Sequence, residues 1–248
     1  MYILGDIGNT DTKVCLVSKN NKIIKKISFS SKELTYNKLT KIFKKNKLKF
    51  KDVKKILFCS VVPKSFNLIK KFLSKKTNIK CHEVKNLNLK SLIKIKVDYK
   101  QVGSDRITNA ISVMDHKNNF IILDFGTATT FDVLVKNTYY GGIISPGVKL
   151  SLNSLSDRAS LIPKIDLKKI TKVVGNNTIS AVRSGFFWGY AGLIDNIINL
   201  IKKEIRKPFK VNITGGFSGL FVNSIKTKVT QNQDITIKGL IKISRLIK

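Results

Sequence analysis

A pattern that occurs twice in the chain constrains its fold more than any other feature. Residues 6–17 read DIGNTDTKVCLV and residues 124–135 read DFGTATTFDVLV. Aligned without gaps, the copies pair Asp6 with Asp124, Gly8 with Gly126, Thr12 with Thr130, Leu16 with Leu134 and Val17 with Val135. Each copy is typical of a strand, a tight polar turn and a second strand. Two such hairpins predict a duplicated domain, with the two copies facing each other across a cleft.

The rest of the chain alternates between strand and helix patterns. The apolar periodicity predicts strands at residues 22–29, 56–62, 93–97, 139–144 and 211–214. It predicts helices at 36–45 and 65–75, from about residues 104 and 148 onward, and at 178–201 and 240–247. This alternation favours an α/β fold. A polar stretch at 115–119, just before the second copy, predicts one domain of residues 1–115 and another of residues 116–248.

The chain is strongly basic, with 47 Lys and Arg against 15 Asp and Glu and a formal net charge of +32. Such a charge is typical of proteins that bind nucleic acid or anionic membranes. Only five of the 47 are arginine, however, which is the residue that binds bases and phosphates in bidentate fashion. The lysines lie in short runs beside Ile, Asn and Leu, which is typical of a compositional bias. We therefore expect neither membrane binding nor specific nucleic-acid binding.

Cysteine and histidine usage excludes several classes of site. The three cysteines, Cys15, Cys59 and Cys81, lack disulfide or metal-ligand spacing, so we expect them to be reduced and mostly buried. His82 and His116 fit no zinc motif, which argues against a zinc site and a Ser-His-Asp triad. No signal peptide is evident, and no apolar run reaches the roughly 18 residues that cross a bilayer. The sequence therefore predicts a cytoplasmic protein.

The common nucleotide-binding loops are missing from the sequence, since neither a complete P-loop nor a GxGxxG pattern is present. The two hairpin turns can bind phosphate instead, because Gly8 and Gly126 let backbone N–H groups point toward a ligand. Side chains that can donate hydrogen bonds lie in or beside the same turns, at Asn9, Thr10, Thr12 and Thr127. Asp6 and Asp124, at strand ends, can hold cations that neutralise phosphate charge, directly or through water.

Several motifs together resemble a known family. The paired hairpins and the sequence TGGFS at 214–218 resemble the acetate and sugar kinase, Hsp70 and actin superfamily. Within it, the chain resembles type III pantothenate kinase through motifs in that family's order: SVVP at 60–63, GSDRITNA at 103–110, DFGTATT at 124–130, GGIISPG at 141–147, and Asn177-Thr178 followed by Ser184-Gly185. The resemblance implies two duplicated actin-like, ribonuclease H-like domains facing a central cleft. It also implies ATP-dependent phosphorylation of pantothenate to 4′-phosphopantothenate, the first step of coenzyme A biosynthesis.

The resemblance assigns expected roles to particular residues. ATP would be bound by Asp6, Ile7, Gly8, Asn9, Thr10, Asp11, Thr12, Lys13, Thr127, Gly215 and Gly216. Pantothenate would be bound by Tyr99, Gly103, Ser104, Asp105, Arg106 and Thr178, with Asp105 accepting the proton of the substrate hydroxyl. Mg²⁺ would be held at Asp6, directly or through water, and a monovalent cation, K⁺ or NH₄⁺, at Asp124. The family implies a homodimer whose substrate pocket lies at the subunit interface.

The chemistry of Asp105 and Arg106 is compatible with these roles. Asp105 falls in the first turn of a predicted helix, where the helix dipole favours a carboxylate. A carboxylate is a weak base for an alcohol, but phosphoryl transfer has a loose transition state in which positioning contributes most of the rate. Arg106 can make a bidentate bond to the carboxylate of pantothenate.

Alternatives remain open from the sequence. The chain could phosphorylate another small molecule, or it could be a non-catalytic regulatory or nucleic-acid-binding member of the same fold. Thr178 could serve only as the N-cap of its helix. The sequence also departs from the family at Asp11, where asparagine is usual, and between Tyr99 and Gly103, where the segment is shorter and lacks a proline.

Overall fold

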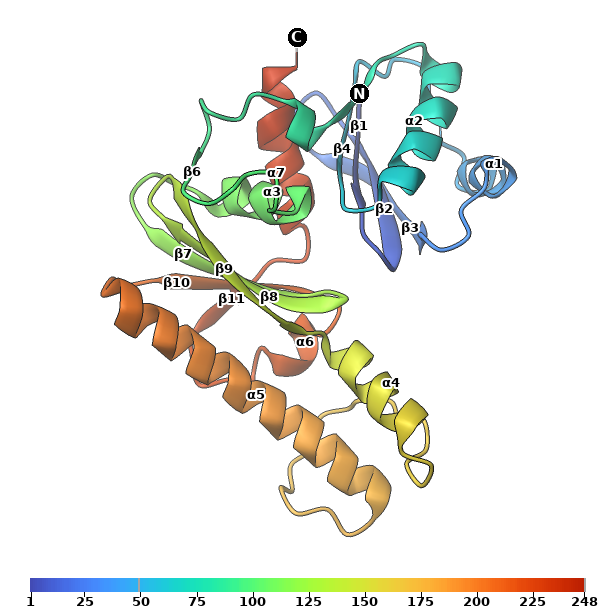
Figure 1. Cartoon of the computed structure of the whole chain (residues 1–248). Coiled ribbons are helices and arrows are strands. Elements are labelled where there is room, and N and C mark those ends of the chain that lie inside the picture. Colours follow the sequence, from blue (N-terminus) through green and yellow to red (C-terminus); the bar gives the residue numbers. More distant parts are fainter. Residues whose placement is uncertain (49, 248) are drawn as a thin grey trace. The chain divides into compact units, whose positions relative to one another are not determined.

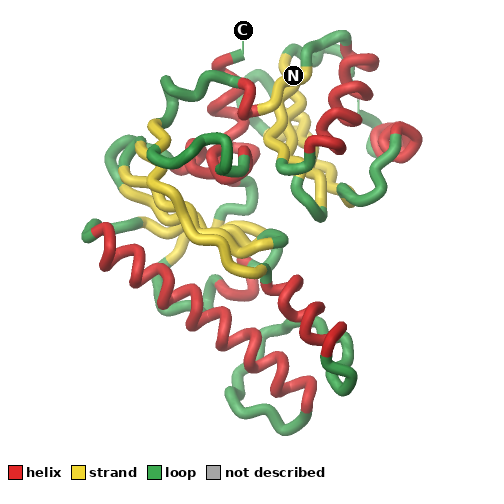
Figure 2. Tube along the Cα trace, viewed as in Figure 1, coloured by secondary structure: helices red, strands yellow, loops and turns green. Residues whose placement is uncertain are grey.

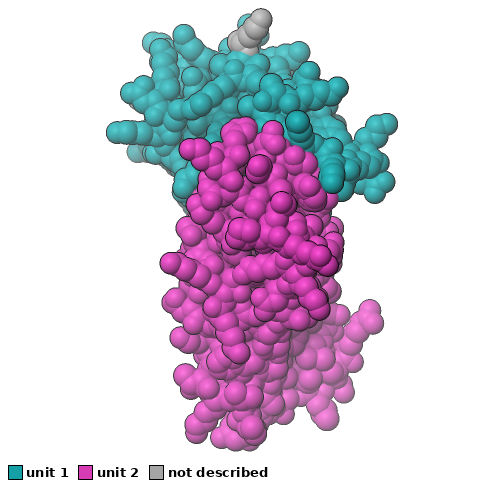
Figure 3. Space-filling view, turned by 90° about the vertical axis from the view of Figure 1, so that its left-hand side faces the viewer, with its two compact units in different colours: residues 1–113, 234–248 teal, residues 114–233 magenta. Residues whose placement is uncertain are grey.

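The computed structural model describes residues 1–48 and 50–247, which form mixed helices and strands (Figures 1 and 2). The chain divides into two compact units (Figure 3). Unit 1 comprises Met1–Val113 and Asp234–Lys248, and unit 2 comprises Met114–Gln233. The first boundary is close to the predicted one at residues 115–116. The C-terminal segment differs from the prediction, because it belongs to unit 1 and not to the second domain.

Unit 1 is built on a five-stranded sheet. Its strands are β1 (Tyr2–Ile7), β2 (Asp11–Val17), β3 (Ile23–Ser30), β4 (Lys55–Ser60) and β5 (Cys81–Glu83), in the order β3-β2-β1-β4-β5. β2 is antiparallel to both β1 and β3, whereas β4 is parallel to β1 and β5 is parallel to β4. Ile3 and Ile7 of β1 lie in a core cluster with Leu39 and Phe72, and Leu4 between them is also fully buried. Because successive side chains alternate between faces, both faces of the sheet are covered.

The helices of unit 1 are α1 (Tyr36–Lys45), α2 (Pro63–Thr77), α3 (Ser104–Val113) and α7 (Ile235–Ile243). Short 3-10 turns lie at Val84–Asn86 and Ser244–Leu246, and β6 consists of Lys94–Ile95 alone. Phe43 of α1 and Phe72 of α2 pack with ring centroids 5.1 Å apart. Pro63 at the first turn of α2 suits a position whose N–H has no partner within the helix.

Contacts between α3 and α7 explain why the C-terminal segment joins unit 1. Gly239 of α7 lies so close to Thr108 of α3 that a Cβ there would collide with the backbone of Thr108. The hydroxyl of Thr236 donates to Oδ1 of Asn109 over 2.8 Å. The ammonium of Lys242 donates to the carbonyls of Ile111 and Ser112 at the C-terminal end of α3, where a cation is favoured. No local pattern reveals such a pairing of segments far apart in the sequence.

Unit 2 repeats the sheet of unit 1. Its strands are β7 (Asn119–Phe125), β8 (Ala128–Val135), β9 (Thr138–Pro146), β10 (Lys210–Gly215) and β11 (Val229–Gln231), in the order β11-β10-β7-β8-β9. β8 is antiparallel to β7 and β9, β10 is parallel to β7, and β11 is parallel to β10. Order and directions thus match those of unit 1 strand for strand, as the repeated sequence predicted.

The helices of unit 2 are α4 (Val148–Arg158), the long α5 (Thr178–Ile205) and the short α6 (Ser218–Phe221). α5 runs along one face of the unit 2 sheet (Figure 1). Phe187 of α5 and Phe125 of β7 both stack on Phe221 of α6, with centroids 5.6 and 5.1 Å apart. This aromatic stack joins the N-terminal half of α5 to β7, the strand that carries Asp124.

The register of the second hairpin corrects one part of the repeat alignment. Ile7 pairs with Thr12 in unit 1, and Phe125 pairs with Thr129 in unit 2. The structural counterpart of Thr12 is therefore Thr129 and not Thr130, because the second turn is one residue shorter. A shift of one residue moves a side chain to the other face of a strand. It explains why Thr12 and Thr129 are both fully buried.

Several short elements differ from the sequence prediction. Cys81–Glu83, Ser218–Phe221 and Val229–Gln231 form elements that the sequence did not predict. The predicted strand at 93–97 is reduced to two residues, and the last helix begins at Ile235 instead of Leu240. Within residues 1–48 and 50–247, no helix is long and apolar enough to cross a membrane.

Candidate active site

The first hairpin turn joins β1 to β2 and exposes a short backbone loop. The N–H of Gly8 donates to the carbonyl of Asp11 over 3.0 Å, which closes the turn. Asn9, Thr10 and Asp11 are exposed at its tip. Backbone and side-chain donors in such a loop can approach a phosphate.

Other predicted residues of this hairpin are not at its surface. Ile7 and Thr12 are fully buried, and the hydroxyl of Thr12 shares a 2.8 Å hydrogen bond with the hydroxyl of Ser31. Lys13 is half-buried and lies opposite Asp6 in the strand pair. The expectation that the Thr12 side chain donates to phosphate therefore conflicts with its position. Thr12 instead holds the turn against the segment that follows β3.

Asp6 is the second-last residue of β1 and lies in surroundings that disfavour its charge. Burial and then the nearby negative charge of Asp105 raise the pKa of Asp6 to about 6, against the lowering effect of Lys13. Cys59 is the partner of Asp6 in the β1–β4 ladder, and its thiol donates to Oδ1 of Asp6 over 3.4 Å. Asp6 and Asp105 thus share one electrostatic environment, and a cation beside them would relieve their repulsion.

Asp105 lies in the first turn of α3, as predicted. Burial raises its pKa, while the N–H and the guanidinium charge of Arg106 act in the opposite direction. The Arg106 N–H donates to Oδ1 of Asp105 over 2.8 Å. The carboxylate folds back over Gly103, where a Cβ would collide with it. Glycine at position 103 therefore allows Asp105 its observed orientation.

Ser104 fixes the start of α3 to the end of β4. Its hydroxyl accepts from the N–H of Ser60 over 2.7 Å and donates to the carbonyl of Ser60 over 3.0 Å. Ser104 is almost completely buried, and Arg106 is half-buried beside Asp105. The SVVP motif at 60–63 thus supports the GSDR motif at 103–106 directly.

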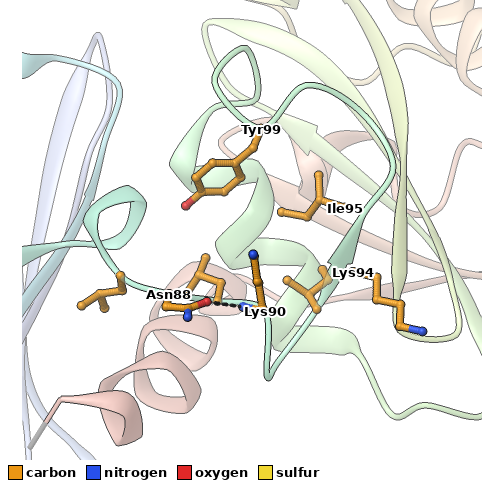
Figure 4. Close-up of a pocket in the computed structure, with 8 residues that line it drawn as sticks. Asn88, Lys90, Lys94, Ile95 and Tyr99 are labelled. Carbon is orange, nitrogen blue, oxygen red and sulfur yellow. Dashed lines mark hydrogen bonds between the residues drawn. The ribbon is translucent and has the colours of Figure 1, made fainter.

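Tyr99 lines a cavity of about 360 Å³ in unit 1. The other lining residues are mainly aliphatic or basic: Leu87, Asn88, Leu89, Lys90, Ile93, Lys94 and Ile95. Tyr99 lies across the cavity from Asn88 and Lys90 (Figure 4). Its hydroxyl donates to the carbonyl of Lys85 over 3.4 Å, and the Lys85 ammonium lies 5.6 Å from its ring centroid. None of the other predicted substrate residues lines this cavity.

The second hairpin turn presents Gly126 and Thr127, which are both exposed. The N–H of Gly126 donates to the carbonyl of Ala128 over 3.0 Å, as Gly8 does in the first turn. Gly147 packs directly on the turn, since a Cβ there would collide with the backbone of Thr127. The last residue of the GGIISPG motif, Gly147, therefore supports the turn that carries Thr127.

Asp124 and the end of β10 are in close contact. Thr214 is the ladder partner of Asp124, and Gly215 is the partner of Phe125. Gly215 has φ +89°, and a Cβ on it would lie 2.6 Å from Oδ1 of Asp124. The N–H of Gly216 donates to the carbonyl of Phe125 over 3.0 Å, and Gly216 is exposed. Glycine at position 215 therefore lets the end of β10 approach the Asp124 carboxylate closely.

Thr178 is the first residue of α5 and is exposed, but it is not the N-cap. Asn177 occupies that position, and its Oδ1 accepts from the Ser180 N–H over 2.9 Å. The Ser180 hydroxyl accepts in return from the Asn177 N–H over 3.1 Å, which completes a capping box. Capping therefore does not account for Thr178.

Two polar residues near these sites were assigned no site role from the sequence. Cys59 was expected only as a buried thiol, although it contacts Asp6. Ser218 is fully buried, and its hydroxyl lies among three hydrogen-bond partners below the Gly215–Gly216 loop. The pairing of β1 with β4 would reveal the first contact. The second depends on the short strand β11, which has no pattern long enough to detect.

The carboxylates available for cations do not form a complete cage. In the described part of the chain, no group of three or more His, Cys, Asp or Glu side chains could hold a metal ion. Single carboxylates suit Mg²⁺ that keeps its waters and binds phosphate oxygens. The charge repulsion between Asp6 and Asp105 fits a cation held in this way.

Comparison with known proteins gives consistent results. The family model described as type III pantothenate kinase matches residues 2–200. A type III pantothenate kinase of Pelagibacter ubique (strain HTCC1062) is 66% identical over 248 residues, which covers 100% of both chains. A type III pantothenate kinase of Desulforapulum autotrophicum is 33% identical over 97% of this chain and 95% of its own.

Solved structures share the fold at low sequence identity. A putative Baf family transcriptional activator from Campylobacter jejuni has a TM-score of 0.58 at 20% identity, covering 98% of this chain and 97% of its own. The activator of the 2-hydroxyisocaproyl-CoA dehydratase from Clostridium difficile has a TM-score of 0.55 at 14% identity, covering 99% and 95%. Identities this low show the fold alone.

Proposed function

The chain belongs to the type III pantothenate kinase family, which phosphorylates pantothenate in coenzyme A biosynthesis, and on that premise we propose how its residues act. The observation that carries the proposal is the shared environment of Asp6 and Asp105, because each carboxylate has a raised pKa. A pair of acids held at the end of β1 and the start of α3 suits phosphoryl transfer to an alcohol. Asp6 would hold the cation that neutralises the phosphates, and Asp105 would accept the proton of the substrate hydroxyl.

Asp105 is the proposed proton acceptor. Its raised pKa makes it a better acceptor than an exposed aspartate, and the Arg106 N–H fixes one carboxylate oxygen in place. The pantothenate hydroxyl oxygen attacks the γ-phosphorus of ATP, its proton passes to Asp105, and ADP leaves with the electron pair of the broken P–O bond. Positioning of the alcohol contributes more to the rate than base strength, because the transition state is loose.

The two hairpin turns are the proposed phosphate site. Exposed Asn9 and Thr10 in the first turn and exposed Thr127 in the second can donate to phosphate oxygens. The loop at Gly215 and Gly216 is proposed to bind the adenosine. Asp11 adds an acid at the tip of the first turn, so it would need a cation or a lysine beside it.

The cation roles remain part of the proposal. A kinase of this family uses ATP with a divalent metal, and Asp6 is the carboxylate proposed to hold it, directly or through water. From the resemblance, Asp124 is proposed to hold K⁺ or NH₄⁺. Bound cations would neutralise the charge of the phosphates and of the acids.

The remaining substrate contacts are proposed from the resemblance. Arg106 would bind the pantothenate carboxylate in bidentate fashion, and Gly103 and Ser104 would shape the pocket around Asp105. Tyr99 and Thr178 would complete it, with the pocket at the interface of a homodimer. The exposed position of Thr178 and its freedom from a capping role support this part. Three buried, free cysteines support a cytoplasmic location.

The proposed function is tested by product formation. Purified protein with ATP and Mg²⁺ should convert pantothenate to 4′-phosphopantothenate, detected by mass spectrometry, with pantetheine and acetate as comparison substrates. Asp157→Asn is the matched control for Asp105→Asn, because Asp157 is an exposed aspartate on α4 whose replacement should not affect product formation. Absence of product in wild-type protein, or equal phosphorylation of acetate, would refute the proposal.

A further inference from the structure

One buried hydroxyl in unit 2 joins the proposed adenosine loop to two glutamines. Ser218 is fully buried, and its hydroxyl donates to the carbonyl of Gly215 over 2.8 Å. The amide nitrogen of Gln231 approaches the same oxygen to 3.0 Å, and the amide nitrogen of Gln233 approaches it to 2.8 Å. Gln231 ends β11, and the two glutamine side chains converge on the loop that follows β10.

The chemistry of this hydroxyl fixes both amide orientations. A serine hydroxyl has one proton and two acceptor lone pairs. Because a backbone carbonyl can only accept, the Ser218 proton must go to Gly215. Both glutamines must then donate to Ser218, so each turns its NH₂ group inward. The carbonyl oxygen of each amide therefore points away from Ser218, where it can accept a hydrogen bond from another group.

The position of the two glutamines, at and just after the end of β11, favours a nucleotide as the group that donates to their carbonyl oxygens. β10 and β11 are parallel, and Gly215 and Gln231 lie at their carboxyl ends. Ligands of α/β sheets bind outside the carboxyl ends of parallel strands. Gln231, Gln233 and Gly216 are all exposed, and a Cβ on Gly216 would meet nothing within 4 Å. Space and two acceptor oxygens thus occur together at this edge.

We propose that Gln231 and Gln233 select the nucleobase of the phosphate donor, with Ser218 as the positioning residue that orients both amides. The proposal rests on the proposed function of the Gly215–Gly216 loop. The 6-position of adenine carries an amino group, which donates, whereas guanine carries a carbonyl, which accepts. Hypoxanthine, the base of ITP, also has a carbonyl there. Outward amide oxygens would bind the amino group and repel the carbonyl, which excludes GTP and ITP.

The experiment compares kcat/KM for ATP, ITP and GTP at saturating pantothenate. Wild-type protein should prefer ATP over ITP by about tenfold or more, which corresponds to about 1.4 kcal/mol. Gln231→Leu and Gln233→Leu combined should bring the ratio close to one. Ser218→Ala should do so with the glutamines in place, because the amides can then flip. Thr230→Val is the matched control, because Thr230 is an exposed β11 residue directly before Gln231 and its side chain lies on the other face of the strand.

Each outcome separates the inference from the function it depends on. If wild-type protein phosphorylates pantothenate but uses ATP and ITP equally, the nucleobase proposal is wrong and the kinase assignment stands. An ATP-to-ITP ratio unchanged in the double variant and in Ser218→Ala would also overturn it. Equal losses with all three nucleotides would give these residues a structural role only. Failure with every nucleotide in wild-type protein would refute the proposed function itself.

Discussion

Gly215→Ala should damage unit 2 far more than the same change at its neighbour, Gly216→Ala. Gly215 has φ +89°, a left-handed conformation that costs an L-residue about 1–2 kcal/mol. Its new Cβ would also lie 2.5 Å from the backbone of Phe125, and such overpacking costs about 1–3 kcal/mol. We expect a loss of about 3 kcal/mol in the free energy of unfolding, or about 6–12 °C in Tm for a chain of this size.

Gly216→Ala provides the control, because the added Cβ would have no heavy atom within 4 Å. Its Tm should stay within about 2 °C of wild type, as for a surface substitution. Thermal unfolding followed by circular dichroism measures both variants, and the KM for ATP reports on the loop. Equal Tm values for Gly215→Ala and wild-type protein would refute the claim that β10 ends in close contact with Asp124.

Three further predictions concern the cation, the charge and the dimer. Activity in sodium-only buffer should be low and should rise with K⁺ or NH₄⁺ at constant ionic strength, whereas equal activity in all three salts would contradict a monovalent cation at Asp124. DNA binding, measured by fluorescence anisotropy, should be weak, independent of sequence and largely abolished by moderate salt, as counterion release requires; a sequence-specific complex near 200 mM salt would instead support the regulatory alternative. Asp105→Asn and a disabling Thr178 variant should complement on subunit exchange and restore about a quarter of wild-type activity, because half of the dimers are mixed and each has one intact site. Mixed dimers verified by mass spectrometry but lacking activity would place both residues in one subunit's site or remove Thr178 from it.

The sequence predicted those elements whose patterns are local. The repeated acid-glycine turn predicted both hairpins, and both are present in the structure. The helix that starts at Ser104 carries Asp105 in its first turn, as expected. The matching strand orders of the two units follow from the same repeat. Local turn chemistry and apolar periodicity suffice for such features.

The features that the sequence missed depend on contacts between distant segments. The last helix joins unit 1 through Gly239 and Lys242, which contact α3 more than a hundred residues away. The buried position of Thr12 follows from the register with β1, and a gapless alignment paired it with the wrong residue of the second copy. Strands of three residues, such as Val229–Gln231, are too short for any periodicity.

The most direct test of the account is the turnover of Asp105→Asn. The isosteric change removes the proposed proton acceptor while the N–H of Arg106 can still donate to the side-chain oxygen. We expect kcat for pantothenate phosphorylation to fall by about 10² or more, as for loss of a general base. The Tm and the affinity for ATP should be retained. A well-folded Asp105→Asn protein with near-wild-type kcat would contradict the assignment of Asp105 as the proton acceptor.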